Sequence, residues 1–158
     1  KADLLAQGEH SGGLAILITT SRAQAKQFKH ELTNGYTILV KNLDEAVEVV
    51  NRIAPEHLEI LINNPSKILK KIKNAGAIFL GPYSPTAVGD YVAGPSHVLP
   101  TSGTAKFFSG LSLADFIKST HSISYSKKAL ENVRGPLEKI AEIEGLSKHL
   151  ESVKVRFL

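Results

Sequence analysis

Four short apolar runs in the first half of the chain are the feature that most restricts its fold. They are LAILITT at 14–20, YTILV at 36–40, HLEILI at 57–62 and AIFLG at 77–81. The stretches between them have helical spacing: one follows Ser21, which can cap a helix, and another stops at Pro55. Apolar runs of strand length that alternate with helices are typical of a parallel sheet with helices packed against it. The sequence therefore predicts an α/β fold with a parallel sheet and flanking helices.

The chain changes character after Gly81. Residues 81–110 are rich in Gly, Pro, Ser and Thr and show little periodicity, yet they retain aromatic and aliphatic side chains. A long stretch of this kind is usually functional or disordered, and its apolar content argues against disorder. HSISYS at 121–126 alternates like a strand. We therefore predict a Rossmann-like but incomplete α/β domain at residues 1–125 that carries a functional loop at 81–110.

The last part of the chain, residues 126–158, is predicted to be a helical arm. One helix starts near Lys127 and a second follows a hinge near Gly145, while Gly135–Pro136 is a potential break within the first. The second helix carries an apolar stripe at Leu150, Val153 and Phe157. This stripe indicates that the arm packs on another surface.

Composition excludes several classes of protein. The 158 residues include no Cys, so neither a disulfide framework nor a thiolate metal site can form. No apolar run reaches about 18 residues, so we expect no membrane partner, and with no visible signal peptide we expect a cytoplasmic protein. The net charge of +4 is mild, and the Lys-rich stretch 67–73 has the spacing of a solvated helix face. Nucleic acid is therefore not an expected partner.

Two pairs of polar residues have spacings that suit a metal site. Gln7 and His10 lie three apart at the end of a predicted helix, which places them on one face. Asp90 and His97 lie in the Gly-rich loop, where the backbone can approach a ligand closely. In a chain without Cys, ligands of these types suit zinc, manganese or cobalt. The alternative is a surface His beside a surface Gln, and a turn-forming Asp with an incidental His.

Two further pairs could take part in proton transfer. Glu56 and His57 are adjacent at the point where the preceding predicted helix ends. His is a natural general base near neutral pH, and a carboxylate beside it can activate water. Glu144 and His149 bracket the hinge between the last two helices. The alternative for both pairs is that they are solvated polar groups. Because the sequence has no phosphate-binding loop and no nucleophile elbow, these residues alone do not identify a reaction.

Several longer segments together resemble the histidinol dehydrogenase family. They are DLLAQGEH, NRIAPEHLE, the run from AGAIFLGPYSPTAVGDYVAGPSHVLP to TSGTAKFFSGLS, and the closing EGLSKHLESVKVR. The resemblance covers nearly the whole chain. It implies a zinc-dependent, NAD-linked, four-electron oxidation of L-histidinol to L-histidine.

The resemblance also implies roles for individual residues. By position, the zinc ligands are Gln7, His10, Asp90 and His149; the general base is His57, the residue that activates water is Glu56, and the substrate contacts are His97 and Glu144. The loop at 81–110 then becomes a metal and substrate loop. The family's dimer, in which the C-terminal arm completes the partner's site, implies a homodimer here.

The chain also departs from the family. The family's chains are far longer, and this one, which contains no Met and begins at Lys1, is similar to their C-terminal portion. We therefore expect a partial enzyme whose NAD-contacting positions lie in the N-terminal portion and which is inactive without it. The segment 28–35 is also shorter than in the family. The alternative function is a non-catalytic, truncated homologue that acts as a metal- or ligand-binding module or as an oligomerisation module.

Overall fold

The computed structural model describes residues 1–9, 11–29, 31–32 and 34–158. It divides into two compact units, Lys1–Ile117 and Lys118–Leu158, here called unit 1 and unit 2. Unit 1 contains α1 (Ala2–Gln7), β1 (Ala15–Thr19), α2 (Arg22–Phe28), β2 (Gly35–Leu39), α3 (Leu43–Ile53), β3 (His57–Ile60), α4 (Ser66–Leu69), β4 (Ala77–Leu80), α5 (Thr86–Tyr91) and the short 3-10 helices η1 (Thr104–Lys106) and η2 (Leu113–Phe116). Unit 2 contains α6 (Lys127–Ile143), α7 (Ser147–Lys154) and η3 (Val155–Phe157).

The first parallel pair joins β1 to β2 through the crossover helix α2. Ser21 caps α2 as predicted, since its hydroxyl accepts a hydrogen bond from the Gln24 backbone N–H at 3.3 Å. The strands run in register from Ala15 opposite Gly35. A Cβ atom at Gly35 would lie 2.3 Å from the Ala15 carbonyl oxygen, so the start of this pair requires glycine.

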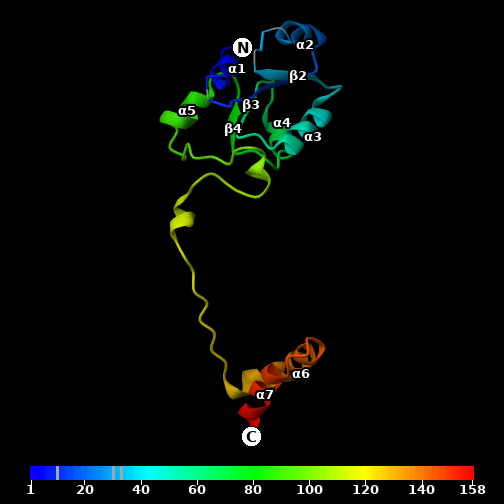
Figure 1. The fold of residues 1–158 in the computed structure, drawn as a ribbon, viewed down its shortest axis with the longest axis vertical. Coiled ribbons are helices and arrows are strands. Elements are labelled where there is room, and N and C mark those ends of the chain that lie inside the picture. The colour runs from blue at the N-terminus through cyan, green and yellow to red at the C-terminus, as the bar shows by residue number, and fades with distance from the viewer. Residues whose placement is uncertain (10, 30, 33) are drawn as a thin grey trace. The chain divides into compact units, whose positions relative to one another are not determined.

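The second parallel pair joins β3 to β4 through α4. Its register starts with His57 opposite Ala77. The α3 helix that leads into β3 is capped by the Asn42 side chain, which accepts a hydrogen bond from Glu45 at 2.9 Å. In the ribbon, α5 lies on one side of the β3–β4 pair, and α3 and α4 lie on the other (Figure 1).

These pairings confirm the predicted α/β class and the parallel direction of the strands. The four strands form two pairs, β1–β2 and β3–β4, in place of one continuous ladder. The buried apolar residues of unit 1 come from both pairs and from α3: Ala15, Val40, Val47, Val50, Ala54, Ile60 and Phe79. Both strand pairs and α3 therefore contribute buried apolar side chains to unit 1.

Unit 2 is a pair of helices joined at Gly145, which has a φ of +71°. The predicted break at Gly135–Pro136 is wrong, because α6 continues through it. Gly135 has no Cβ to clash with the proline ring, which removes part of the usual penalty. An ion pair from Arg134 to Glu138 at 2.8 Å also spans the position, and the Arg134 guanidinium lies 4.7 Å from the centre of the Phe157 ring.

The structure also corrects two expectations for the non-helical stretches. The strand predicted at 121–126 is wrong: these residues have no regular structure, and Ile123 and Tyr125 are exposed. A lone strand without a neighbour leaves its backbone groups unpaired by the chain. Conversely, the loop at 81–110 contains the helix α5, which its sequence pattern did not reveal. No helix in the described part of the chain has the length and apolar character that a membrane crossing requires.

Candidate functional site

Pro55 and its neighbours direct the chain from α3 into β3. The helix stops at Ala54, which is fully buried and has a left-handed φ of 52°. The Pro55 and Glu56 carbonyls then accept hydrogen bonds from Gly76 at 2.9 Å and Ala77 at 2.8 Å. Because these hydrogen bonds pair the two chain segments directly after the helix, His57 is the first residue of β3. It therefore lies at the N-terminal end of the strand pair.

The His57 ring is the most constrained polar group of this region. Its side chain is only 12% exposed, and its Nε2 atom lies 3.7 Å from Asp90 Oδ1. Neither ring nitrogen has a hydrogen-bond partner among the described residues, because 3.7 Å exceeds the hydrogen-bond range. Unpaired polar atoms of this kind are rare in native structures and point to a functional role. Both imidazole nitrogens are therefore buried and unpaired among the described residues.

Asp90 comes from α5, which packs against the β3–β4 pair. Its first residue, Thr86, donates two hydrogen bonds to Glu59 Oε1, from the backbone N–H and from the hydroxyl, each at 3.1 Å. The Phe79 ring of β4 lies against His57, with 6.0 Å between the ring centres. Sequence reasoning missed Glu59 and Phe79. The two-residue period of a strand could have indicated Glu59, since it places Glu59 on the same face as His57.

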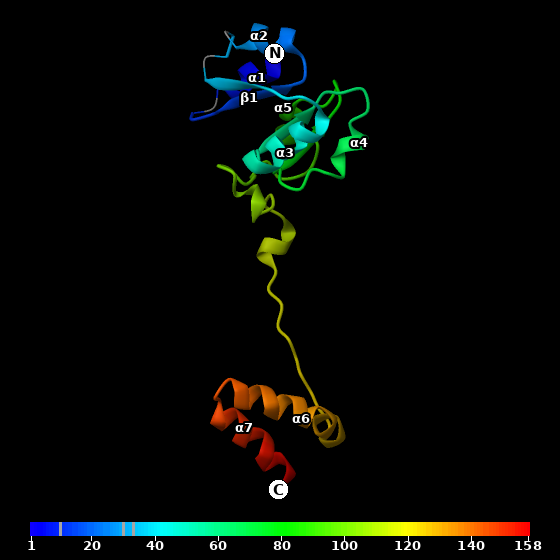
Figure 2. The ribbon, with the colours of Figure 1, turned by 90° about the vertical axis from the view of Figure 1, so that its right-hand side faces the viewer.

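The remaining predicted ligand positions of unit 1 lie near its N-terminus. Gln7 is the last residue of α1 and is half-buried, whereas His10 lies outside the described residues. In two views of the ribbon, α1 and α5 lie next to each other (Figures 1 and 2). Among the residues that the structure describes, no group of three His, Cys, Asp or Glu side chains is placed to hold a metal ion. The structure thus brings together His57 and Asp90, and Gln7 lies in the neighbouring helix.

Glu56 is half-buried, whereas His97, Glu144 and His149 are exposed. His97 lies in the irregular segment between α5 and η1. In unit 2, Glu144 follows the last residue of α6 and His149 lies in α7, on either side of the Gly145 turn. Nothing buries these three side chains within their own units.

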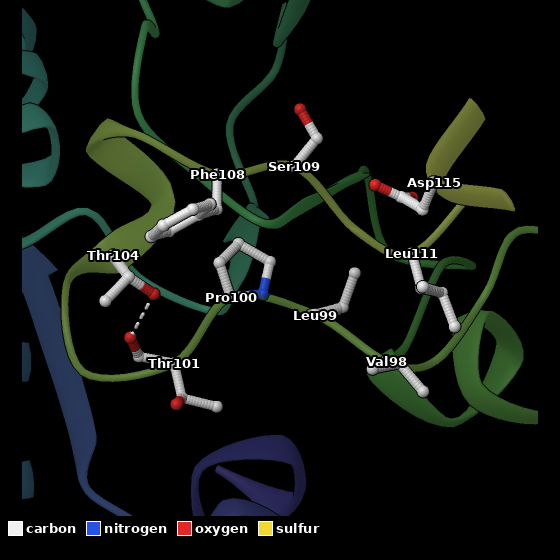
Figure 3. A pocket seen from close by; sticks show the side chains of 9 residues that line it. All are labelled: Val98, Leu99, Pro100, Thr101, Thr104, Phe108, Ser109, Leu111 and Asp115. Atoms are coloured by element: carbon white, nitrogen blue, oxygen red, sulfur yellow. Dashed lines mark hydrogen bonds between the residues drawn. The ribbon is translucent and has the colours of Figure 1, made fainter. Parts of the chain in front are cut away.

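An open hollow of about 300 Å³ lies beside His97 in the chain but does not contain it (Figure 3). Its walls mix apolar and polar side chains and come from Val98, Leu99, Pro100, Thr101, Thr104, Phe108, Ser109, Leu111 and Asp115. One wall is shaped by the Thr104 hydroxyl, which donates a hydrogen bond to the Thr101 carbonyl at 2.6 Å. The polar residues predicted for catalysis lie outside this hollow.

Comparison with known proteins identifies the family. The histidinol dehydrogenase family profile matches residues 1–157. The histidinol dehydrogenase of Caldanaerobacter subterraneus is 49% identical over 175 residues, which cover 99% of this chain and 41% of that protein. The chain belongs to the histidinol dehydrogenase family. The enzyme of Bacillus cereus agrees, at 46% identity with the same coverage.

A crystal structure of histidinol dehydrogenase from Elizabethkingia anophelis has the same fold as this family member. Its TM-score is 0.87 at 35% identity, and the match covers 99% of this chain and 40% of that one. The chain therefore spans about two-fifths of the length of these relatives. The alignments extend over 175 residues, more than the 158 of this chain, so the relatives contain residues that it lacks.

The predicted zinc ligands of this family member can be compared with the donor types that zinc accepts. Zinc accepts imidazole nitrogen and carboxylate oxygen ligands. Asp90 is 23% exposed, and its only polar side-chain partner within the described residues is His57. Its carboxylate therefore remains available to a cation. By donor type, Asp90 and His149 are ligands that zinc accepts, and the described residues do not gather three such side chains at one place.

Proposed function

We propose that this chain supplies the catalytic base and the metal-binding loop of a histidinol dehydrogenase, which oxidises L-histidinol to L-histidine in the cytoplasm. The observation that carries the proposal is the His57 ring, which is almost buried, faces Asp90 at 3.7 Å and has two unpaired nitrogens among the described residues. A base of this kind suits the removal of a hydroxyl proton during the oxidation of an alcohol. The membership of the family supports the choice of histidinol as substrate.

Both oxidation steps use the same base. In the first step His57 takes the hydroxyl proton while the carbinol carbon loses a hydride, which gives the aldehyde. Glu56 then removes a proton from a water molecule that adds to the aldehyde carbon, while His57 returns its proton to the aldehyde oxygen and is again neutral. His57 takes the hydroxyl proton of the hydrated aldehyde as the second hydride leaves, which gives the carboxylic acid. NAD, when bound, supplies the redox chemistry by accepting one hydride in each step.

The metal and substrate contacts complete the proposal. The proposed zinc ligands are Gln7, His10, Asp90 and His149, and the proposed substrate contacts are His97 and Glu144. Zinc, when bound, orients the substrate and polarises it. Because Glu144 and His149 belong to unit 2, we propose that the arm of one copy completes the site of its partner in a homodimer.

Substitution of His57 tests the function. In the intact enzyme we expect His57→Asn to lower the rate of histidinol-dependent NADH formation by at least about 100-fold, the usual contribution of a positioned general base. His121→Asn is the matched control, because His121 is an exposed His in an irregular segment. Equal activities of the two variants would refute the role of His57.

The second candidate function is a non-catalytic homologue that binds metal or ligand, or that serves oligomerisation. The large apolar side chains that both units expose favour an oligomerisation role. That protein would form no NADH from histidinol even when the N-terminal portion of a relative is supplied. Production of NADH in that mixture favours the enzyme.

A further inference from the structure

Two side chains of β3 face the same helix. Residues two apart in a strand point to the same face, and His57 and Glu59 have this spacing. Glu59 Oε1 accepts both hydrogen bonds from Thr86, the first residue of α5. Asp90 follows Thr86 by one helical turn and lies opposite His57. The strand and the helix therefore meet at two matched positions.

A third contact comes from β4. Phe79 lies opposite Glu59 in the strand register, so its ring is on the same face of the pair. Gly89 of α5 sits on this ring, because a Cβ atom at Gly89 would lie 2.6 Å from Phe79 Cε1 and Cζ. The helix α5 therefore contacts β4 at Gly89, the residue before Asp90.

The helix α5 has little stability of its own. It has only six residues, whereas isolated helices shorter than about 12 residues are marginal in water. Pro85 at its N-cap position makes no side-chain hydrogen bond, so the first turn has no local cap. The Glu59 carboxylate takes that role from a position 27 residues earlier in the chain.

We propose that Glu59 is a positioning residue that fastens the first turn of α5 to β3 and thereby holds the Asp90 carboxylate opposite the His57 ring. Glu59 does not touch the reacting atoms itself. The fastening of α5 is independent of the reaction, and only its consequence for the metal and the substrate rests on the proposed function.

The test compares Glu59 variants in the intact protein. We expect Glu59→Ala to accelerate amide hydrogen exchange in the peptide that covers α5 by roughly fivefold, as for the loss of a helix cap. We expect zinc affinity, measured by competition with a chromophoric chelator, to fall about tenfold, because Asp90 loses its support. Glu59→Gln should stay close to the wild type in both measurements, since both hydrogen bonds go to one oxygen that glutamine retains.

Two further variants complete the design. Thr86→Val removes only the hydroxyl donor, so it should accelerate exchange less than Glu59→Ala and serves if that variant does not fold. Glu48→Gln is the matched control, because Glu48 is an exposed residue of α3 whose side chain makes no hydrogen bond or ion pair with the described residues.

The outcomes separate the inference from the function. If the rate of amide hydrogen exchange in α5 is the same in Glu59→Ala and Glu48→Gln, Glu59 does not fasten the helix to β3. Faster exchange in α5 with unchanged zinc affinity and unchanged kcat overturns the positioning of Asp90. A wild-type protein that takes up no zinc contradicts the proposed function, while the exchange comparison still decides whether Glu59 holds the helix.

Discussion

At the scale of single residues, Asn51 organises the turn that leads into β4. Its Oδ1 atom accepts hydrogen bonds from the Lys73 N–H at 2.7 Å and the Asn74 N–H at 3.2 Å, and its Nδ2 donates to the Lys71 carbonyl at 3.0 Å. Asn74 returns a bond to the Asn51 carbonyl at 2.8 Å. One side chain of α3 thus satisfies backbone groups of an irregular turn, which brings Gly76 to the start of the strand ladder.

This network predicts that Asn51→Ala is destabilising. The substitution removes three hydrogen bonds from the turn, so we expect the free energy of unfolding to fall by about 2 kcal/mol in urea denaturation. Asn63→Ala is the control: Asn63 is exposed and lies in a bend, so its loss should change stability by less than about 0.5 kcal/mol. Similar effects of the two substitutions would show that the turn is held in another way.

The sequence is sufficient to identify some of these residues but not their partners. Pro55 marks the end of a helix, and the next two positions attract notice because they are titratable and adjacent. The approach of Asp90 to His57 depends on a packing that no local pattern encodes. The same is true of Asn51, whose partners lie about 20 residues further along the chain.

At the scale of elements, local sequence patterns predict a helix or strand correctly where nearby residues stabilise that element. Each of the four described strands coincides with an apolar run of strand length. The α5 helix was missed because its cap comes from Glu59 on another element. The predicted strand at 121–126 has the right alternation but no neighbouring strand, and alternation alone does not supply one.

The packing of α5 predicts the sign of a glycine substitution. In an isolated helix Gly89→Ala would stabilise by about 1 kcal/mol. Here the new Cβ would meet the buried Phe79 ring at 2.6 Å, so we expect a net loss of about 1–3 kcal/mol in thermal unfolding. The double variant with Phe79→Leu should show a smaller loss from Gly89→Ala, because the shorter side chain relieves the clash. A stabilising effect of Gly89→Ala alone would contradict the described contact.

At the scale of the whole molecule, both units expose large apolar side chains. In unit 1 these include Phe107, Leu113 and Phe116, and in unit 2 they include Ile123, Ile140 and Ile143. Exposed apolar surface of this extent commonly marks an interface. It supports the proposed homodimer, in which His149 of one copy serves the site that holds His57 of the other.

The proposed homodimer predicts complementation between two inactive variants. We expect His57→Asn and His149→Asn to be inactive separately, since each removes a group from every site. In mixed dimers one site carries both substitutions and the other carries neither. Random mixing of subunits should therefore restore about a quarter of the wild-type rate of NADH formation. An arm that served its own copy would give no recovery. Wild-type protein taken through the same mixing procedure controls for activity lost in the procedure.

The two strand registers have a consequence for how unit 1 folds. Ala15 pairs with Gly35 and His57 pairs with Ala77, so both parallel pairs join residues 20 positions apart. The conformational entropy lost on closing a loop depends on its length, and these two loops are equal. Parallel sheets are usually slow to form because their contacts are distant in sequence, and a short separation lowers the contact order. The two strand–helix–strand segments therefore lose a similar conformational entropy when their strands pair, and neither is favoured over the other by chain length.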